Sequence, residues 1–222
     1  MLDLKRVTLF AIYTSFDKAK TATQDFQDGE KEKILDNGLE DTIRALYTCL
    51  ESAEFGAVRF ITSKNVIDER GKDLLEDGIV CEEPSIPINN MKDYARYMIY
   101  HLHEHVVTDF VLTIQHDGFI LNPDAWRDDF FDYDYIGAPW PWREQGFVTP
   151  FGEHIAVGNG GFSLRSKKLT EVPTKVDVPF DVVAMNDFYK MFGGVNWNDD
   201  GNICVHNRHI FEEHGCKFAP VE

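Results

Sequence analysis

The sequence has few basic residues, no closely spaced cysteine pair and no long apolar run. Its 222 residues include 38 Asp or Glu against 22 Lys or Arg, and the formal net charge is −16. Binding to a phosphate backbone needs an excess of positive charge, so nucleic acid is not an expected partner. A phosphorylated small ligand would need a metal ion or backbone N–H groups to offset the repulsion.

The cysteines and the apolar segments bear on the compartment. Four cysteines are scattered along the chain without a C-x-x-C pair, which indicates a reducing compartment and core positions for the thiols. The apolar run that follows Arg6 is short and lacks a small-residue cleavage site, so it predicts a strand instead of a signal peptide. No stretch approaches the roughly 20 apolar residues of a membrane span. We therefore expect a soluble, cytoplasmic protein.

The first half of the chain alternates strand and helix patterns. Apolar, β-branched runs predict strands at 6–14, 57–63, 78–83 and 108–114. Asn37 and Glu40 form a capping-box pattern before one predicted helix, and Asn90 precedes a second. Polar residues 15–36 predict a functional or mobile loop. The order of elements favours an α/β fold with a mainly parallel sheet flanked by helices.

The second half is rich in aromatic residues, glycine and proline over residues 124–163. A helix is predicted at about 199–214, ended by Gly215 and followed by a last strand. The chain contains no internal repeat and no Ser/Pro-rich linker. It therefore reads as a single domain over residues 1–222.

Polar residues follow the strand predicted at 108–114. Gln115, His116 and Asp117 come directly after it, and ligands of open α/β sheets bind at the carboxyl ends of the strands. Asp117 is well placed to hold a divalent cation, which can in turn hold a diphosphate. The alternative is that Asp117 caps a turn with Gly118 and that His116 is a polar strand end.

Two other strand ends offer weaker candidates at the same edge. Tyr13 and Thr14 end the first strand, where an aromatic ring and a hydroxyl could contact a nucleobase, although many strand exits look the same. Lys64 ends the second strand; a solvated lysine is the simpler interpretation.

The aromatic and glycine-rich segments could face a ligand. Trp140 and Trp142 stand among prolines, and such rigid platforms can stack on sugars or can serve as an apolar lid or core plug. The stretch "GNGGFSLRS" includes Asn159, Gly160 and Gly161 before a predicted strand, so backbone can approach a ligand closely there. It does not open a helix, which excludes a dinucleotide fingerprint and a P-loop.

An acidic pair, Asp199 and Asp200, begins the C-terminal helix. The helix dipole favours ionised carboxylates at this place. Capping accounts for one of them, and the second could act as a general base. His206 and His209 lie one turn apart on the same helix; either could complete a metal site with Asp117, or both could be surface residues.

Taken together, five segments resemble a known family. "LTIQHDGFI", "YDYIGAPW", "GNGGFSLRS", "NDDGNIC" and "GCKFAP" occur in this order in a group of small, poorly characterised glycosyltransferases that resembles the GT-A class of nucleotide-sugar transferases. The resemblance covers residues 6 to 220. It implies a GT-A-like mixed, mainly parallel sheet, with a nucleotide-binding half at 6–123 and an acceptor and catalytic half at 124–222.

The resemblance also implies roles for residues. GT-A enzymes usually carry Asp-x-Asp at the strand end, where this chain has Gln115 in place of the first acid and Asp117 in place of the second. Asp117, with His206, would hold Mn²⁺ or Mg²⁺. The acidic pair implies Asp200 as catalytic base, assisted by Asp199.

The remaining implied contacts belong to the substrates. The donor would meet the strand ends and the glycine segment, and the acceptor would meet the tryptophans. The donor-binding residues would be Tyr13, Thr14, Lys64, Gln115, His116, Asp117, Asn159, Gly160 and Gly161, and the acceptor-binding residues Trp140 and Trp142.

Three functions follow as hypotheses. The first is an inverting glycosyltransferase of carbohydrate biosynthesis that uses a UDP-, GDP- or dTDP-sugar and a glycan or glycoconjugate acceptor. The second is a non-catalytic nucleotide-sugar or carbohydrate-binding protein on the same fold. The third is a metal-dependent phosphate hydrolase that uses Asp117, Asp199 and His206.

Overall fold

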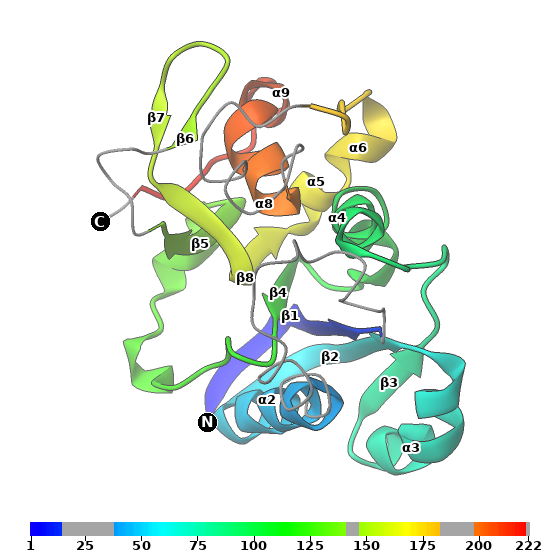
Figure 1. Cartoon of the computed structure of the whole chain (residues 1–222). Coiled ribbons are helices and arrows are strands. Elements are labelled where there is room, and N and C mark those ends of the chain that lie inside the picture. The colour runs from blue at the N-terminus through cyan, green and yellow to red at the C-terminus, as the bar shows by residue number, and fades with distance from the viewer. Residues whose placement is uncertain (15–37, 141–146, 183–197, 221–222) are drawn as a thin grey trace, which may run out of the picture.

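The computed structural model of the chain describes residues 1–14, 38–140, 147–182 and 198–220. Its centre is a six-stranded sheet with the order β3-β2-β1-β4-β8-β5 (Figure 1). β1 pairs in parallel with β2 and β4, β2 pairs in parallel with β3, and β8 runs antiparallel to β4 and β5. The strands are β1 (Leu2–Tyr13), β2 (Ala53–Thr62), β3 (Ile79–Glu82), β4 (Phe110–Ile114), β5 (Tyr135–Pro139) and β8 (Val157–Ser166). The mixed, mainly parallel sheet is confirmed.

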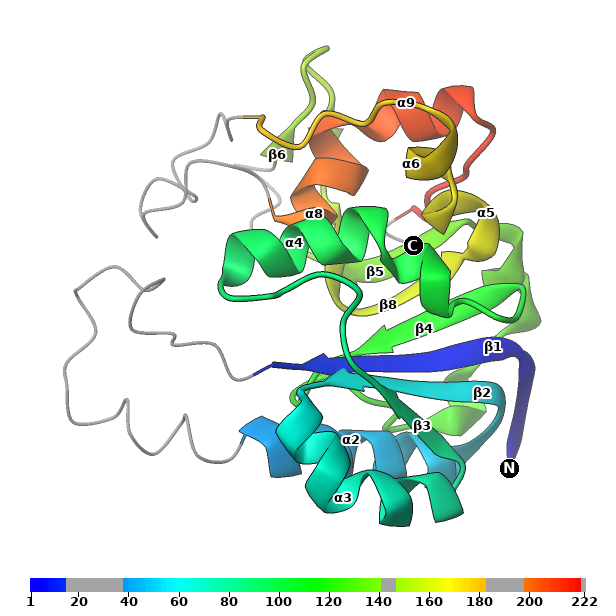
Figure 2. The same cartoon turned by 90° about the vertical axis from the view of Figure 1, so that its right-hand side faces the viewer.

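Helices cover both faces of this sheet. α2 (Gly38–Ser52) and α3 (Lys64–Glu76) lie on one face, and α4 (Met91–Tyr100) and α8 (Asp199–Gly201) lie on the other (Figure 2). A hairpin of β6 (Phe147–Val148) and β7 (His154–Ile155) stands apart from the main sheet. The shorter helices are α5 (Lys167–Thr170), α6 (Val172–Lys175), α9 (Arg208–Glu213), a π-helix (Asn202–His206) and 3₁₀ turns at Leu102–His105, Pro123–Ala125 and Asp128–Asp132. No helix among the described residues is long and apolar enough to cross a membrane.

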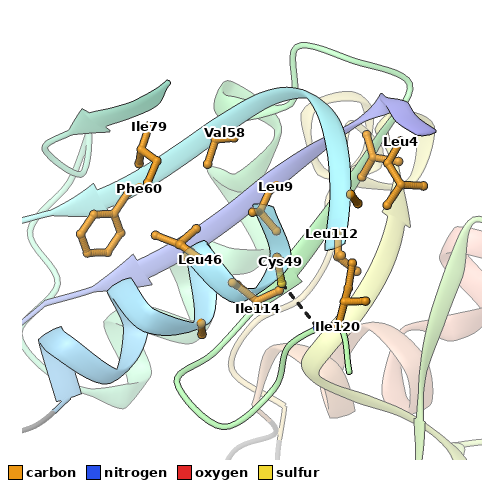
Figure 3. Packing of buried hydrophobic residues seen from close by; sticks show 14 of the residues in the cluster. Leu4, Leu9, Leu46, Cys49, Val58, Phe60, Ile79, Leu112, Ile114 and Ile120 are labelled. Atoms are coloured by element: carbon orange, nitrogen blue, oxygen red, sulfur yellow. Dashed lines mark hydrogen bonds between the residues drawn. The ribbon is translucent and has the colours of Figure 1, made fainter. Parts of the chain in front are cut away.

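Strand alternation divides the apolar core between the two faces. Leu9 belongs to the cluster beneath α2, whereas its neighbour Phe10 packs in the cluster beneath α4, because successive side chains of a strand point to opposite faces. Leu46 and Cys49 of α2 meet side chains of β1, β2, β3 and β4 there (Figure 3). The Cys49 thiol also accepts a hydrogen bond from the backbone N–H of Ile120 at 3.5 Å. The scattered cysteines thus include a core thiol, as the sequence predicts.

Helix starts are confirmed in part. Asn90 caps α4, since its side chain accepts a hydrogen bond from the Asp93 N–H at 2.9 Å. Asn37 of the predicted capping box lies outside the described residues, as does the loop at 15–36. Glu40 instead pairs with Arg70 of α3 at 2.6 Å. The sequence carries no helix signal between β2 and β3. α3 lies there, but it buries only Leu74 and so lacks the apolar stripe that predicts a helix.

Three predictions for the second half are wrong in detail. The glycine-rich stretch does not precede a strand; it lies within β8. The helix predicted at 199–214 is broken into α8, the π-helix and α9, although it ends at Gly215, whose φ of +76° suits glycine. Where a last strand was predicted, Phe218 makes only an isolated parallel bridge to Tyr135.

A buried histidine links α4 to the sheet near the end of β3. His105 is 7 % exposed. Its Nδ1 lies 2.9 Å from Glu82 Oε2 and its Nε2 lies 2.7 Å from the Tyr97 hydroxyl. Burial lowers the pKa of His105 below its ordinary 6.5, against the opposing effect of Glu82.

Acid should therefore weaken the fold through His105. Because the folded-state pKa lies below the unfolded value, this contribution to stability is present above pH 6.5 and is lost as the pH falls below it. We expect His105→Gln to reduce the fall in melting temperature between pH 7 and pH 5, measured by calorimetry. The exposed His154→Gln is the matched control and should keep the wild-type slope. Equal slopes in all three proteins would contradict the assignment.

Candidate functional site

The carboxyl ends of the parallel strands meet at one edge of the sheet. Tyr13 lies opposite Thr62 in the β1–β2 register, Ala11 lies opposite Ile114 in β1–β4, and Ile61 lies opposite Glu82 in β2–β3. The structure thus puts the residues after β1, β2 and β4 along the edge at which α/β sheets bind ligands.

Of the three polar residues after β4, Gln115 is half-buried, whereas His116 and Asp117 are exposed. The Gly118 N–H donates to the Gln115 carbonyl at 3.1 Å and closes a tight turn. The Gln115 side chain donates to the Tyr94 hydroxyl of α4 at 3.2 Å. His116 and Asp117 are exposed on the turn. A ligand could reach Asp117 without displacing a protein contact among the described residues.

The glycines of β8 bring two elements close to the strand backbone. A Cβ on Gly161 would lie 3.1 Å from Gln115 Oε1, and a Cβ on Gly160 would lie 3.1 Å from Asp200 Cβ. Both distances are shorter than ordinary contacts, so only glycine leaves the β4 end and α8 this close. The side chain of Asn159 bonds within the same segment: its Oδ1 accepts a hydrogen bond from the Gly161 N–H at 3.0 Å.

The acidic pair is asymmetric. The Asp199 side chain is 10 % exposed and receives a hydrogen bond from Arg165 Nη2 at 2.9 Å, while Arg165 itself is fully buried. Asp200 is half-buried, and its oxygens accept the backbone N–H groups of Gly160 at 3.2 Å and Gly201 at 2.7 Å. One carboxylate is thus paired with a cation, and the other faces backbone amides.

This asymmetry governs proton affinity. Burial, and next the charge of Asp199, raise the pKa of Asp200 to about 7, against the lowering effects of the two N–H groups and Arg165. The expectation that the helix start keeps both carboxylates ionised is therefore wrong for Asp200. The helix α8 is only 3 residues long, so it offers a weaker dipole than the long helix predicted from the sequence.

Replacing Asp200 should stabilise the protein in alkali. An acid whose folded-state pKa is raised binds its proton more tightly when folded, so stability falls as the pH rises from about 4 to 7. Asn cannot ionise, and its amide oxygen can accept a backbone N–H. We expect Asp200→Asn to raise the free energy of unfolding at pH 8 by on the order of 1–3 kcal/mol, and by less at pH 5. Urea unfolding measures this; a gain that does not depend on pH, or one shared by the exposed control Asp124→Asn, would contradict it.

Other predicted donor residues have local partners or lie outside the cluster. Lys64 starts α3, where its amine pairs with Asp68 at 3.2 Å and its side chain is 68 % exposed, so the solvated-lysine interpretation describes it. Tyr13 is half-buried against the start of α2, since a Cβ on Gly38 would lie 3.0 Å from its ring. The Thr14 hydroxyl is buried and has no hydrogen-bond partner in the described part of the chain.

Of the two predicted acceptor-binding tryptophans, the structure describes Trp140 alone, and its ring is packed against other side chains. Trp140 is half-buried, and its ring meets Phe147 edge-on with 4.5 Å between centroids. A Cβ on Gly158 would lie 2.6 Å from it, so this ring fills space behind β8 as a core plug does. Trp142 lies outside the described residues.

The predicted metal ligands do not form a protein-only metal site. Asp117 is exposed, and His206 is half-buried on the π-helix, where burial lowers its pKa. Within 1–14, 38–140, 147–182 and 198–220, no group of three or more His, Cys, Asp or Glu side chains could hold a metal ion. A lone exposed carboxylate suits a divalent cation whose other ligands come from water and substrate phosphates.

An apolar cavity of about 370 Å³ lies on the α2 face of the sheet, opposite the acidic pair. Apolar side chains of β1, β4, β5 and β8 form its floor, and the segment after β4 forms its cover. The lining is Leu2, Leu112, Phe119, Ile120, Asn122, Pro123, Ala125, Trp126, Phe130, Ile136, Gly137, Ala138, Phe162 and Leu164. Without a charged side chain, this cavity does not have the chemistry of the predicted nucleotide site.

Arg165 and Tyr94 contact the candidate site but were not among the site residues predicted from the sequence. Arg165 donates to Ser163 Oγ at 3.0 Å as well as to Asp199, and its guanidinium lies 5.2 Å from the centre of the Tyr135 ring. The signal was strand alternation, because the stretch 162–166 places Ser163 and Arg165 on one face with apolar neighbours between them. An arginine on a face turned toward helices requires a buried acidic partner. Tyr94 left no signal beyond its place on the apolar face of α4.

The fold and the site define a mixed α/β protein with a polar cluster beside the end of β4. The chain belongs to the family described as "Protein of unknown function (DUF5672)", whose profile matches residues 80–212. That match includes the turn after β4, the glycines of β8 and the acidic pair. No curated protein matches the chain.

Two solved structures are similar to this chain along most of its length. One is 4-diphosphocytidyl-2C-methyl-D-erythritol synthase from Anaerococcus prevotii, with 13 % identity, 95 % of each chain covered and a TM-score of 0.37. The other, from Bacillus anthracis, is described as a glucose-1-phosphate thymidylyltransferase in complex with sucrose, with 13 % identity, 97 % of this chain and 98 % of that chain covered, and a TM-score of 0.40. At these scores the likeness is weak and bears on neither activity nor ligand.

Proposed function

We propose that this protein is a glycosyltransferase that moves a sugar from a nucleoside-diphosphate sugar to an acceptor hydroxyl with inversion. The observation that carries the proposal is the half-buried Asp200, whose pKa is raised to about 7 beside the glycines of β8 and the end of β4. The order of the five sequence motifs, which resembles GT-A transferases, supports the sugar-nucleotide chemistry.

A carboxylate with a pKa near neutrality suits general-base catalysis. Such a group is available in its basic form at pH 7 and yet has enough proton affinity to accept a hydroxyl proton. Hydrogen bonds from the Gly160 and Gly201 N–H groups hold its oxygens in place. Positioning of this kind lowers the entropic cost of bringing base and acceptor together.

The proposed reaction is a single displacement. The acceptor oxygen attacks the anomeric carbon as its proton passes to Asp200, and the bond from that carbon to the diphosphate oxygen breaks. The nucleoside diphosphate leaves with the bonding electrons. On this proposal Gln115, Asn159 and the β8 glycines line the sugar of the donor, and Tyr13 and Thr14 meet its nucleoside.

One alternative has a specific observation in its favour. Gln115 stands where the first acid of Asp-x-Asp would be, and its amide is bonded to Tyr94 at 3.2 Å. A protein on this fold that binds a nucleotide sugar without turnover could keep such an arrangement. The phosphate hydrolase has less in its favour, because Asp199 is paired with buried Arg165 and so is poorly placed to ligate a metal.

Transfer should depend on Asp200 while donor binding does not. A thermal-shift panel of UDP-, GDP- and dTDP-sugars with Mn²⁺ identifies the donor, and release of nucleoside diphosphate in the presence of glycan acceptors measures turnover. We expect Asp200→Asn to lower turnover roughly 10²- to 10⁴-fold and to preserve the donor-induced shift. Asp124→Asn, on an exposed turn, is the control and should turn over normally.

The other outcomes distinguish the alternatives. A donor-induced shift without turnover by the wild type would favour the binding protein, and release of inorganic phosphate would favour the hydrolase. Full activity of Asp200→Asn would remove Asp200 from the mechanism.

Asp117 should carry the cation dependence. If a divalent cation bridges Asp117 and the donor diphosphate, Asp117→Asn should remove most of the additional thermal shift that Mn²⁺ gives with the donor. The shift given by donor alone should remain, because the other contacts are intact. His206→Gln tests the second predicted ligand in the same assay. A Mn²⁺-dependent shift that both variants retain would overturn the predicted metal ligands.

A further inference from the structure

We propose that Arg165 is a positioning residue that holds the carboxylate of Asp199 in an ion pair beside Asp200 and thereby makes Asp200 the carboxyl group that gains and loses a proton in this site. The inference rests on the proposed function only for the source of that proton, an acceptor hydroxyl. It adds a role for a residue outside the acidic pair, on a different element of the fold.

Two adjacent carboxylates in a crowded site compete for one proton. Asp199 and Asp200 are consecutive in α8, and both approach the backbone of Gly160, where a Cβ would lie 3.4 Å from Asp199 Oδ2 and 3.1 Å from Asp200 Cβ. Ionising both at once is unfavourable because their charges repel across a medium that screens poorly. The surroundings of each carboxyl therefore decide which one carries the proton.

The surroundings of Asp199 hold it in an ion pair. Arg165 cannot give up its proton in a protein, and its side chain is fully buried, so its charge requires a partner. The 2.9 Å bond from Nη2 to Asp199 Oδ2 provides that partner. Ser163 Oγ, which accepts from Nε at 3.0 Å, fixes the guanidinium in this direction.

The surroundings of Asp200 favour exchange of a proton. Among the described residues, two backbone N–H groups donate hydrogen bonds to it and no cation pairs with it. It is also the more exposed of the two acids, so a substrate hydroxyl can reach it. The pair is thereby divided into a constant negative charge and a titrating base.

The other titratable groups around the pair stay neutral at pH 7. Burial raises the pKa of the Tyr94 hydroxyl on α4. It does the same for Tyr135 on β5 and for the Cys204 thiol on the π-helix. The charges that decide the titration of Asp200 are therefore those of Asp199 and Arg165.

Two opposite effects of Arg165 on Asp200 can be told apart. Its direct attraction stabilises ionised Asp200, so if nothing else mattered, removing it would move the titration of Asp200 upward. If instead its main effect is to hold the negative charge of Asp199 beside Asp200, removing it weakens the repulsion that Asp200 feels. The titration of Asp200 then moves downward.

The test is a carbon-13 NMR titration of aspartate side-chain carboxyl groups, assigned with single Asp→Asn variants. In the wild type we expect Asp200 to titrate near pH 7. In Arg165→Met we expect its midpoint to fall clearly below the wild-type value, although burial alone keeps it above the ordinary aspartate range of about 4. A rise, or no change, would overturn the proposal.

Three further variants keep the test decisive. Arg165→Lys retains the positive charge and should leave Asp200 titrating near its wild-type midpoint. Arg96→Met removes an arginine on α4 that pairs with Asp181 and should change nothing. If Arg165→Met fails to fold, Asp199→Asn decides: it keeps an oxygen for Nη2 but no charge, so the midpoint of Asp200 should fall, because burial is then the main cause that raises its pKa. A midpoint that stays near 7 would overturn the proposal.

These titrations need neither donor nor acceptor. If the midpoints move as expected and no transfer is found, the proposed function fails and the role of Arg165 stands. If transfer depends on Asp200 and its midpoint is indifferent to Arg165 and Asp199, the proposed function stands and this inference fails.

Discussion

The ion pair between Arg165 and Asp199 is the interaction on which the candidate site depends. It joins β8 of the main sheet to the C-terminal helices, beside the hydrogen bond from the Gly160 N–H to Asp200. Because Arg165 is fully buried, removing either partner would leave an uncompensated charge, a change that typically costs about 3–5 kcal/mol. Such a pair contributes little as a net source of stability but strongly selects one arrangement of β8 and α8. The same selection fixes where Asp200 stands.

A steric constraint accompanies this electrostatic one. Glycine weakens a strand, and yet β8 contains several in its first half. A Cβ at Gly160 would lie 2.9 Å from Arg165 Nη2 and 3.1 Å from Asp200 Cβ, and a Cβ at Gly161 would lie 3.1 Å from Gln115 Oε1, so these neighbours would have to move. The glycines therefore lower the intrinsic stability of β8, but they let its backbone lie close to the end of β4 and to α8. This explains why a glycine-rich stretch lies in a sheet rather than in a phosphate-binding loop.

Much of the sheet could be predicted because its strands carry strong, local signals. The runs that became β1, β2, β3 and β4 are apolar and β-branched, and Asn90 marks a helix start by its own hydrogen bond. α3 could not be predicted, because Leu74 is its only fully buried side chain and Val66 packs on the core only in part, so its apolar residues form no continuous stripe. The candidate site likewise contains residues that the sequence indicates and contacts that it does not. Asp199 and Asp200 stand out in the sequence, whereas the burial of Arg165 and the bond between Gln115 and Tyr94 arise only when distant segments meet.

Charge balance constrains how this protein could hold a nucleoside diphosphate. The chain carries a net charge of −16, and the cations described near the strand edge are engaged: Lys64 with Asp68 and Arg165 with Asp199. The N–H groups of Gly160 and Gly161 already bond to Asp200 and Asn159. A diphosphate at this edge would therefore gain little compensation from the described side chains. A divalent cation beside the exposed Asp117 would supply the positive charge, which gives the prediction of Mn²⁺ or Mg²⁺ a physical basis that does not depend on the resemblance of motifs.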